Sequence, residues 1–152
     1  MDKLLEEIKQ TLETDRNFSK AVEILKNIDE NTLREALIWL AIDTQNISYY
    51  FIVLQLIHDK ETAPLHLTAS RLLSVSLVSF EGAEIIALNH LRRAIELDSS
   101  DVNLKLELLS FFESPERLVS EEEAKNIIDN YYDSASKEIQ DRMNNIKKRR
   151  NW

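Results

Sequence analysis

Three histidines, His58, His66 and His90, are the residues of this chain best suited to acid–base catalysis or to metal binding. They are separated by 8 and 24 residues, and no H-E-x-x-H motif or repeated Glu-x-x-His motif accompanies them. Such motifs place several ligands on neighbouring turns of a helix, which scattered histidines do not achieve from sequence spacing alone. We therefore expect no catalytic residue, no metal site and no cofactor.

His90 is the most informative of the three, because it interrupts a helical stripe of small and apolar residues. In one interpretation it is a structural histidine that hydrogen-bonds to a backbone carbonyl. In the other it is a groove residue or a general base. We favour the structural interpretation, although a pocket holding His90 within hydrogen-bonding reach of two carboxylates would favour an enzyme.

Other catalytic chemistry also lacks its usual residues. The chain contains no Cys, which excludes thiolate nucleophiles, disulfides and Cys-bound zinc and is typical of a reducing compartment such as the cytoplasm. No serine lies in a G-x-S-x-G motif, and a single Gly excludes a glycine-rich phosphate loop. The aromatic run Tyr49, Tyr50 and Phe51 lies within an apolar helical pattern, where core packing is the usual explanation.

The charge balance indicates the class of partner. Asp and Glu number 27 and Lys and Arg 19, and four of the 19 lie in "KKRR", residues 147–150. We interpret residues 1–146 as a single domain with 15 basic and 27 acidic residues, and residues 147–152 as a basic C-terminal tail. An acidic body repels nucleic acid and favours a basic protein partner.

Export and membrane insertion are not expected. The first residues, "MDKLLEEIKQ", have acids where a signal peptide needs a basic head and an apolar run. The longest apolar stretch, residues 47–57, contains Gln55 and is shorter than the roughly 20 residues that cross a bilayer. The sequence thus predicts a cytoplasmic protein without a membrane-spanning helix.

The elements that must position these side chains are predicted to be helices throughout. One Gly and two Pro are too few for a fold with frequent turns, and apolar residues recur at spacings of three and four. Eight or nine helices are predicted, beginning near residues 2, 18, 31, 47, 65, 83, 101, 120 and 136. Asn31, Asp101 and Ser120 are the expected N-caps among these starts. The third and fourth helices are apolar nearly all round, so Trp39 and Ile52 should be buried, as should Leu91 and Leu108.

Helix–turn–helix units with little else between them predict an all-α fold, a short stack of antiparallel α-hairpins. In "LNHLRRAIELDSSD", Ala87 and Ala94 lie seven residues apart with Leu91 between them. This stretch resembles the second helix of a tetratricopeptide repeat, and the match covers about one repeat, residues 65–99, with a weaker echo over 104–132. The resemblance implies a tetratricopeptide- or HEAT-like superhelix with a concave binding surface.

The predicted function is a non-enzymatic, protein-binding helical-repeat module. If the repeat register holds, the concave groove contains Arg71 and Val75 from the fifth helix and Lys105, Leu109 and Phe112 from the seventh. A narrower hypothesis follows from the sequence pattern "AIELD…LLSFFE…SEEEA". This pattern looks like that of small acidic bacterial immunity proteins and implies an inhibitor of a basic toxin or nuclease. The alternative is an enzyme whose site is assembled from scattered His and carboxylate residues.

Overall fold

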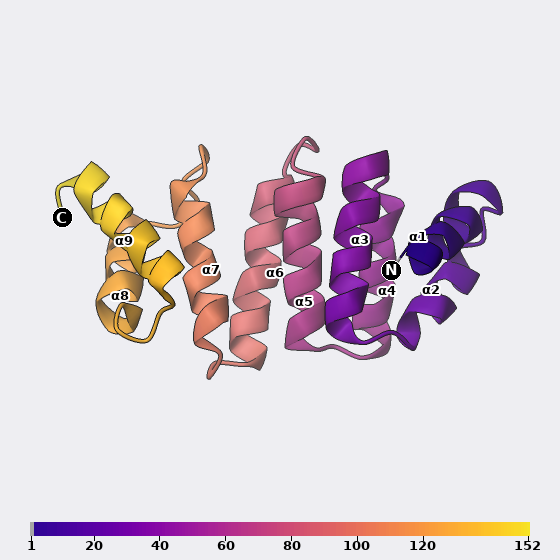
Figure 1. Ribbon diagram of the computed structural model, residues 1–152, viewed down its shortest axis with the longest axis horizontal. Coiled ribbons are helices and arrows are strands. Elements are labelled where there is room, and N and C mark those ends of the chain that lie inside the picture. The colour runs from indigo at the N-terminus through magenta and orange to yellow at the C-terminus, as the bar shows by residue number, and fades with distance from the viewer. Residues whose placement is uncertain (1) are drawn as a thin grey trace. The chain divides into compact units, whose positions relative to one another are not determined.

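The computed structural model describes residues 2–152 as helices joined by short turns (Figure 1). Over these residues there are nine α-helices, two short π-helical segments and no strand. The predicted all-α fold with eight or nine helices is confirmed. Backbone contacts divide the chain into unit 1, Met1–Ser99, and unit 2, Ser100–Trp152.

Unit 1 contains six α-helices and both π-helical segments. In chain order they are α1 (Asp2–Lys9), η1 (Gln10–Thr14), α2 (Phe18–Lys26), α3 (Glu30–Thr44), α4 (Ser48–Asp59), α5 (Ala63–Arg71), η2 (Leu72–Ser76) and α6 (Ala83–Leu97). Successive helices from α3 to α6 run in opposite directions, as Figure 1 shows. This part of the unit therefore consists of antiparallel hairpins, as the short connections predict.

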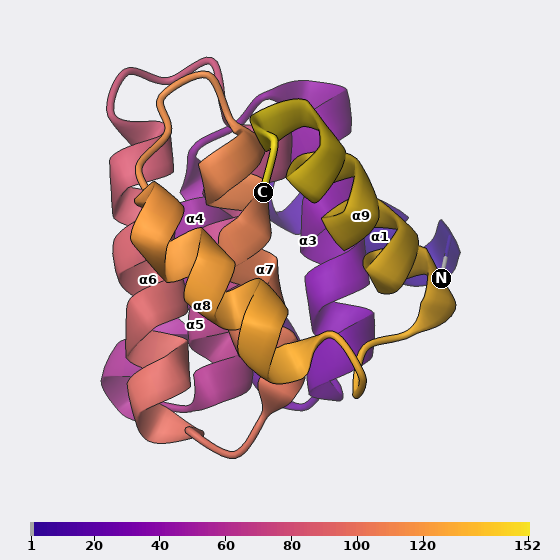
Figure 2. The ribbon, with the colours of Figure 1, turned by 90° about the vertical axis from the view of Figure 1, so that its left-hand side faces the viewer.

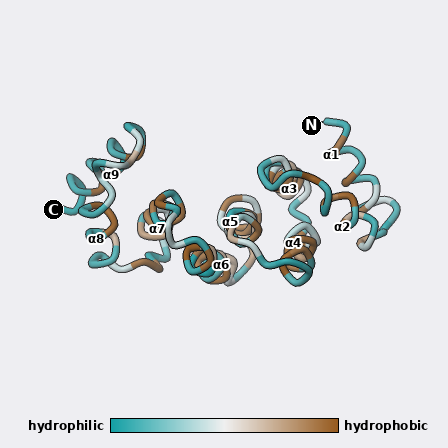
Figure 3. Tube along the Cα trace, turned by 90° about the horizontal axis from the view of Figure 1, so that it is seen from below, coloured by the Kyte–Doolittle hydropathy of each residue, from teal (hydrophilic) through white to brown (hydrophobic). Residues whose placement is uncertain are grey.

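Unit 2 contains α7 (Val102–Glu113), α8 (Glu121–Tyr131) and α9 (Lys137–Arg150), and Figure 2 shows α8 and α9 from the side at which the chain ends. Although α9 is mostly hydrophilic (Figure 3), it buries Met143 and Ile146. The helix also includes Lys147–Arg150, so the predicted boundary between residues 146 and 147 falls inside a regular element. None of the helices over residues 2–152 is long and apolar enough to cross a bilayer.

Side-chain caps fix several helix starts. The Asp101 carboxylate accepts a hydrogen bond from the Asn103 amide at 2.8 Å, and Ser120 Oγ accepts from the Glu123 amide at 3.2 Å, as predicted. The third helix differs, because its cap is Asp29, which accepts from the Thr32 amide, and Asn31 lies inside the first turn. Both residue types can cap a helix, so type alone did not distinguish them.

The core of unit 1 is densest where α5 and α6 meet, which is the most extensive contact between elements of this unit. Ala69 on α5 and Ala87 and Ala94 on α6 are fully buried. Small side chains allow two helix backbones to approach closely. The predicted burial of Ile52 and Leu91 in unit 1 is confirmed, as is that of Leu108 in unit 2.

The prediction that Trp39 is buried is wrong, because its side chain is 62% exposed. The buried stripe of α3 is made by Leu33, Ala36, Leu37, Leu40 and Ala41. At 3.6 residues per turn, Trp39 lies about 200° around the helix from Leu37, on the opposite side. The exposure of Ile42 and Phe51 shows likewise that α3 and α4 are not surrounded by protein, despite their apolar sequences.

Replacing Leu91 by Ala should lower the free energy of unfolding by ~2–5 kcal/mol, because the side chain is buried and its removal leaves a cavity. Glu7→Ala is the control, since Glu7 is exposed on α1. Urea unfolding followed by circular dichroism compares the two. Equal unfolding midpoints would contradict the placement of Leu91 in the core.

Candidate functional site

The five residues predicted to bind a partner lie in two units and in different environments. Arg71 ends α5 and is half-buried, and Val75 in η2 is exposed. On α7, the Lys105 ammonium lies 5.4 Å from the centre of the Tyr131 ring, whereas Leu109 and Phe112 are buried. Phe112 nevertheless lines an open cleft of about 380 Å³ in unit 2, together with Glu113, Pro115 and Arg150. Leu109 and Phe112 are both buried because α7 buries side chains around most of its circumference.

The C-terminal residues are held within unit 2. The Glu113 carboxylate accepts hydrogen bonds from Arg142 and Arg149 of α9. The Trp152 ring lies 5.5 Å from that of Phe112, and the Lys125 ammonium lies 4.8 Å from the Trp152 ring centre. These contacts make part of the "KKRRNW" segment integral to unit 2 rather than a separate arm.

An open cleft lies between α1 and α3 in unit 1, and we call it the Trp39 cleft. Its volume is about 280 Å³, and it is lined by Leu5, Glu6 and Lys9 of α1 and by Trp39, Leu40 and Asp43 of α3. Lys9 Nζ and Asp43 Oδ2 are 2.7 Å apart and join the two helices. A largely exposed indole beside a cleft is the type of anchor found at protein interfaces.

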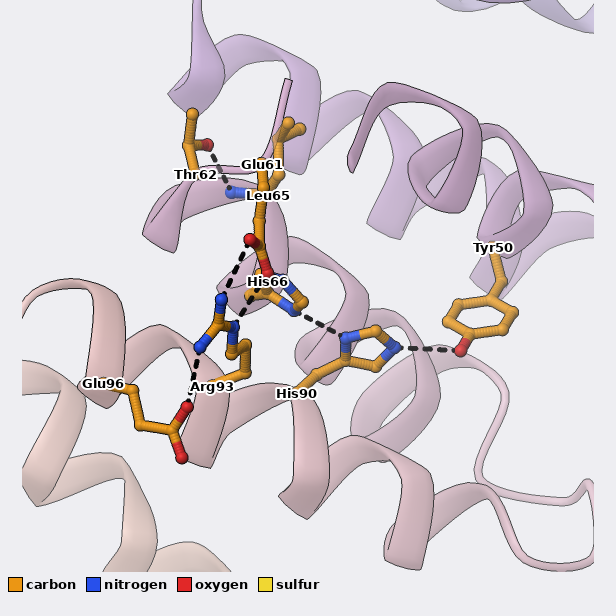
Figure 4. A network of polar contacts seen from close by, with 8 residues as sticks. All are labelled: Tyr50, Glu61, Thr62, Leu65, His66, His90, Arg93 and Glu96. Atoms are coloured by element: carbon orange, nitrogen blue, oxygen red, sulfur yellow. Dashed lines mark hydrogen bonds and ion pairs between the residues drawn. The ribbon is translucent and has the colours of Figure 1, made fainter. Parts of the chain in front are cut away.

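A second candidate is a chain of polar side chains that connects α4, the turn before α5, α5 and α6 (Figure 4). Tyr50 Oη lies 2.9 Å from His90 Nε2, and His90 Nδ1 lies 2.8 Å from His66 Nδ1. His66 Nε2 lies 3.0 Å from Glu61 Oε1. Arg93 donates to both Glu61 oxygens, at 2.8 and 3.0 Å, and to Glu96 at 2.9 Å. We call Tyr50, Glu61, His66, His90 and Arg93 the histidine network.

Burial and charge shift the titration of this network. Burial, and secondarily the charge of His66, lower the pKa of His90 to about 4. Hydrogen bonds from Arg93 and then from His66 lower the pKa of Glu61 to about 2, so this carboxylate is ionised at neutral pH. Burial also raises the pKa of the Tyr50 hydroxyl. His90 is thus neutral at neutral pH, and the ionised Glu61 carboxylate contacts the opposite side of the His66 ring.

The histidine network can hold and transfer protons, but it lacks other parts of a catalytic site. Both ring nitrogens of His90 already have partners, and the one carboxylate of the network reaches it through His66. These contacts therefore do not place two carboxylates within hydrogen-bonding reach of His90, which is the arrangement that would favour an enzyme. The described part of the chain also has no group of three or more His, Cys, Asp or Glu placed to bind a metal ion.

The sequence interpretation missed the meeting of His66 and His90. A signal was present, because His66 shares a buried stripe with Ala69 on α5 and Leu73 on η2, while His90 lies between Ala87 and Ala94 on α6. When two consecutive antiparallel helices pack through their buried faces, the polar residues on those faces lie at the same interface. Sequence spacing does not give the register that makes them neighbours.

The free energy of unfolding should fall as the pH falls from about 6.5 to about 4. The unfolded chain protonates His90 near its ordinary pKa of 6.5, whereas the folded chain does so only near 4. One proton bound only by the unfolded state lowers stability by at most about 1.4 kcal/mol per pH unit. Urea unfolding at pH 7.0, 6.0 and 5.0 should therefore show a steeper dependence for the wild type than for His90→Gln. Equal slopes would contradict a His90 ring that partial burial keeps neutral.

Comparison of the chain with protein-family models, with curated proteins and with solved structures gives no significant match. The tetratricopeptide resemblance therefore rests on the sequence of residues 65–99 and, more weakly, on that of residues 104–132. The Trp39 cleft and the histidine network both lie in unit 1.

Proposed function

We propose that the protein is a non-enzymatic binding module and that unit 1 binds a basic protein partner at the Trp39 cleft. The exposure of Trp39, 62% of its side chain beside a cleft of about 280 Å³, carries the proposal. Trp is among the residues most enriched at interface hot spots, where burial of the indole on binding contributes to affinity. A wall of two helices suits an apolar side chain presented by a partner helix.

The charges around the cleft indicate the chemistry of the partner. Unit 1 has 16 Asp and Glu against 10 Lys and Arg, a difference of −6. At the cleft, Asp43 is paired with Lys9, while Glu6 lines the wall and Glu35 is exposed one turn before Trp39. A partner segment with an apolar anchor and flanking Lys or Arg would match this pattern.

The narrower form of the proposal is inhibition of a basic toxin or nuclease by an acidic immunity protein of tetratricopeptide-like architecture. The negative charge of unit 1 supports it, because opposite charges accelerate the encounter of an inhibitor with its target. The sequence pattern that resembles small acidic bacterial immunity proteins supports this narrower proposal as well. The enzymatic alternative gains no such support from the contacts of His90, which are with Tyr50 and His66.

Trp39→Ala should weaken partner binding by at least about thirtyfold, because a hot-spot side chain contributes roughly 2 kcal/mol or more. Phe51→Ala is the matched control, since Phe51 is a similarly exposed aromatic residue of unit 1 that does not line the cleft. The partner is first captured with the wild-type protein from host extract and identified by mass spectrometry. The purified pair is then measured by surface plasmon resonance. An acidic partner, or equal affinity of Trp39→Ala and wild type, would contradict the proposal.

Trp39 can also report binding directly. The chain has two tryptophans, so Trp152→Phe leaves Trp39 as the single tryptophan, whose emission can be excited selectively over that of the tyrosines. Burial by the partner should shift its emission to shorter wavelength and reduce quenching by acrylamide. Adding Glu6→Lys to the Trp152→Phe variant should slow its association with the partner. Added salt should slow the association of the Trp152→Phe variant itself. Unchanged emission and quenching in a saturated complex would show that the partner binds elsewhere.

A further inference from the structure

The hydrogen bond between the two histidines can hold only one proton. His66 Nδ1 and His90 Nδ1 are 2.8 Å apart, so one nitrogen must donate and the other accept. The tautomers of the two rings are therefore linked. Fixing the proton on one ring fixes the role of every other polar atom in the histidine network.

With both rings neutral, the ionised Glu61 sets one direction for the whole chain. Its carboxylate can only accept, so His66 donates from Nε2 and is left with an acceptor at Nδ1. His90 must then donate from Nδ1 and accept at Nε2, where the Tyr50 hydroxyl donates. Every hydrogen bond of the network is satisfied in this state.

We propose that the histidine network is a proton-operated switch, in which protonation of His66 reverses the hydrogen bond to His90 and moves the His90 proton from Nδ1 to Nε2. The pair takes up one proton from solvent in this step. His90 passes its Nδ1 proton to His66 Nδ1 and receives one at Nε2, so one imidazolium forms, on His66, and His90 remains neutral. His90 Nε2 now donates to Tyr50 Oη, which changes from donor to acceptor.

The surrounding groups determine which ring carries the charge. His66 faces the Glu61 carboxylate, whereas His90 faces the hydroxyl of Tyr50 on α4. On α6, Arg93 pairs with Glu61 and Glu96, and on α3, Glu30 accepts from the Thr62 hydroxyl at the start of α5. The anion in direct contact with a ring is thus Glu61, at His66. His90 is partly shielded from solvent, and burial disfavours its charged form.

The switch alters contacts between three helices without breaking them. The Tyr50–His90 bond joins α4 to α6, and the His66–His90 bond joins α5 to α6. All the hydrogen bonds remain in both protonation states. Donor and acceptor exchange roles in the Tyr50–His90 bond and in the His66–His90 bond when the protonation state changes. This inference is independent of the partner proposed for the Trp39 cleft.

The test is a titration of the histidine side chains by long-range ¹H–¹⁵N correlation spectroscopy between pH 8 and pH 5. The chain has three histidines, and the exposed His58 serves as an internal reference. On acidification His66 should become doubly protonated, while His90 should stay neutral and change from the Nδ1–H to the Nε2–H tautomer with the same midpoint. Retention of one His90 tautomer throughout, or protonation of His90 before His66, would overturn the proposal.

Two variants separate the switch from ordinary titration of single residues. Glu61→Gln keeps an acceptor for His66 Nε2 but removes the anion, so the common midpoint should move to lower pH by several tenths of a unit or more. Glu30→Gln is the matched control, because Glu30 bonds Thr62 at the same end of α5 and contacts neither histidine. Equal midpoints for Glu61→Gln and Glu30→Gln would remove Glu61 from the mechanism and overturn it.

Discussion

The close packing of α5 against α6 is the constraint on which the rest of unit 1 depends. Ala69, Ala87 and Ala94 leave little side-chain volume at this interface, and all three are fully buried. The helices can therefore approach closely enough for the inner nitrogens of His66 and His90 to lie 2.8 Å apart. A larger residue at any of these alanines would separate both the apolar contacts and the histidine pair.

Polar groups at such an interface must be satisfied, because an unpaired buried donor or acceptor costs roughly 1–3 kcal/mol. The histidine network meets this requirement by ending in groups that reach solvent. Glu61 and Arg93 are both exposed in part, and their ion pair connects the turn before α5 to α6. The same network that satisfies the buried rings also gives them access to protons. The Trp39 cleft lies on other elements, α1 and α3, where apolar and charged side chains form the lining and no histidine is among them.

Much of the fold could be predicted from the sequence because helical periodicity and capping residues are local signals. Asp101 and Ser120 cap helices as predicted, and the buried Leu91 and Leu108 lie on clear stripes. Trp39 could not be placed in this way, since an apolar helix such as α3 offers several possible inward faces and only tertiary packing selects one. Phe112 was assigned to a groove from a repeat register, which does not give its contacts with Arg150 and Trp152.

The candidate sites depend on contacts that no local pattern encodes. His66 and His90 are 24 residues apart, and their pairing requires the register of α5 against α6, which η2 and the turn containing Gly82 set between them. Gly82 has φ of +78°, a conformation that glycine adopts without strain. The Trp39 cleft similarly joins α1 to α3 across more than 30 residues.

The most direct test of this packing is a measurement of scalar coupling across the N–H···N hydrogen bond between His66 and His90. With both side chains labelled with ¹⁵N, a correlation between the two Nδ1 nuclei at neutral pH is expected, because their separation of 2.8 Å requires one shared proton. If both Nδ1 resonances are observed, the bonding proton is resolved and no coupling connects them, the α5–α6 register described for unit 1 is incorrect.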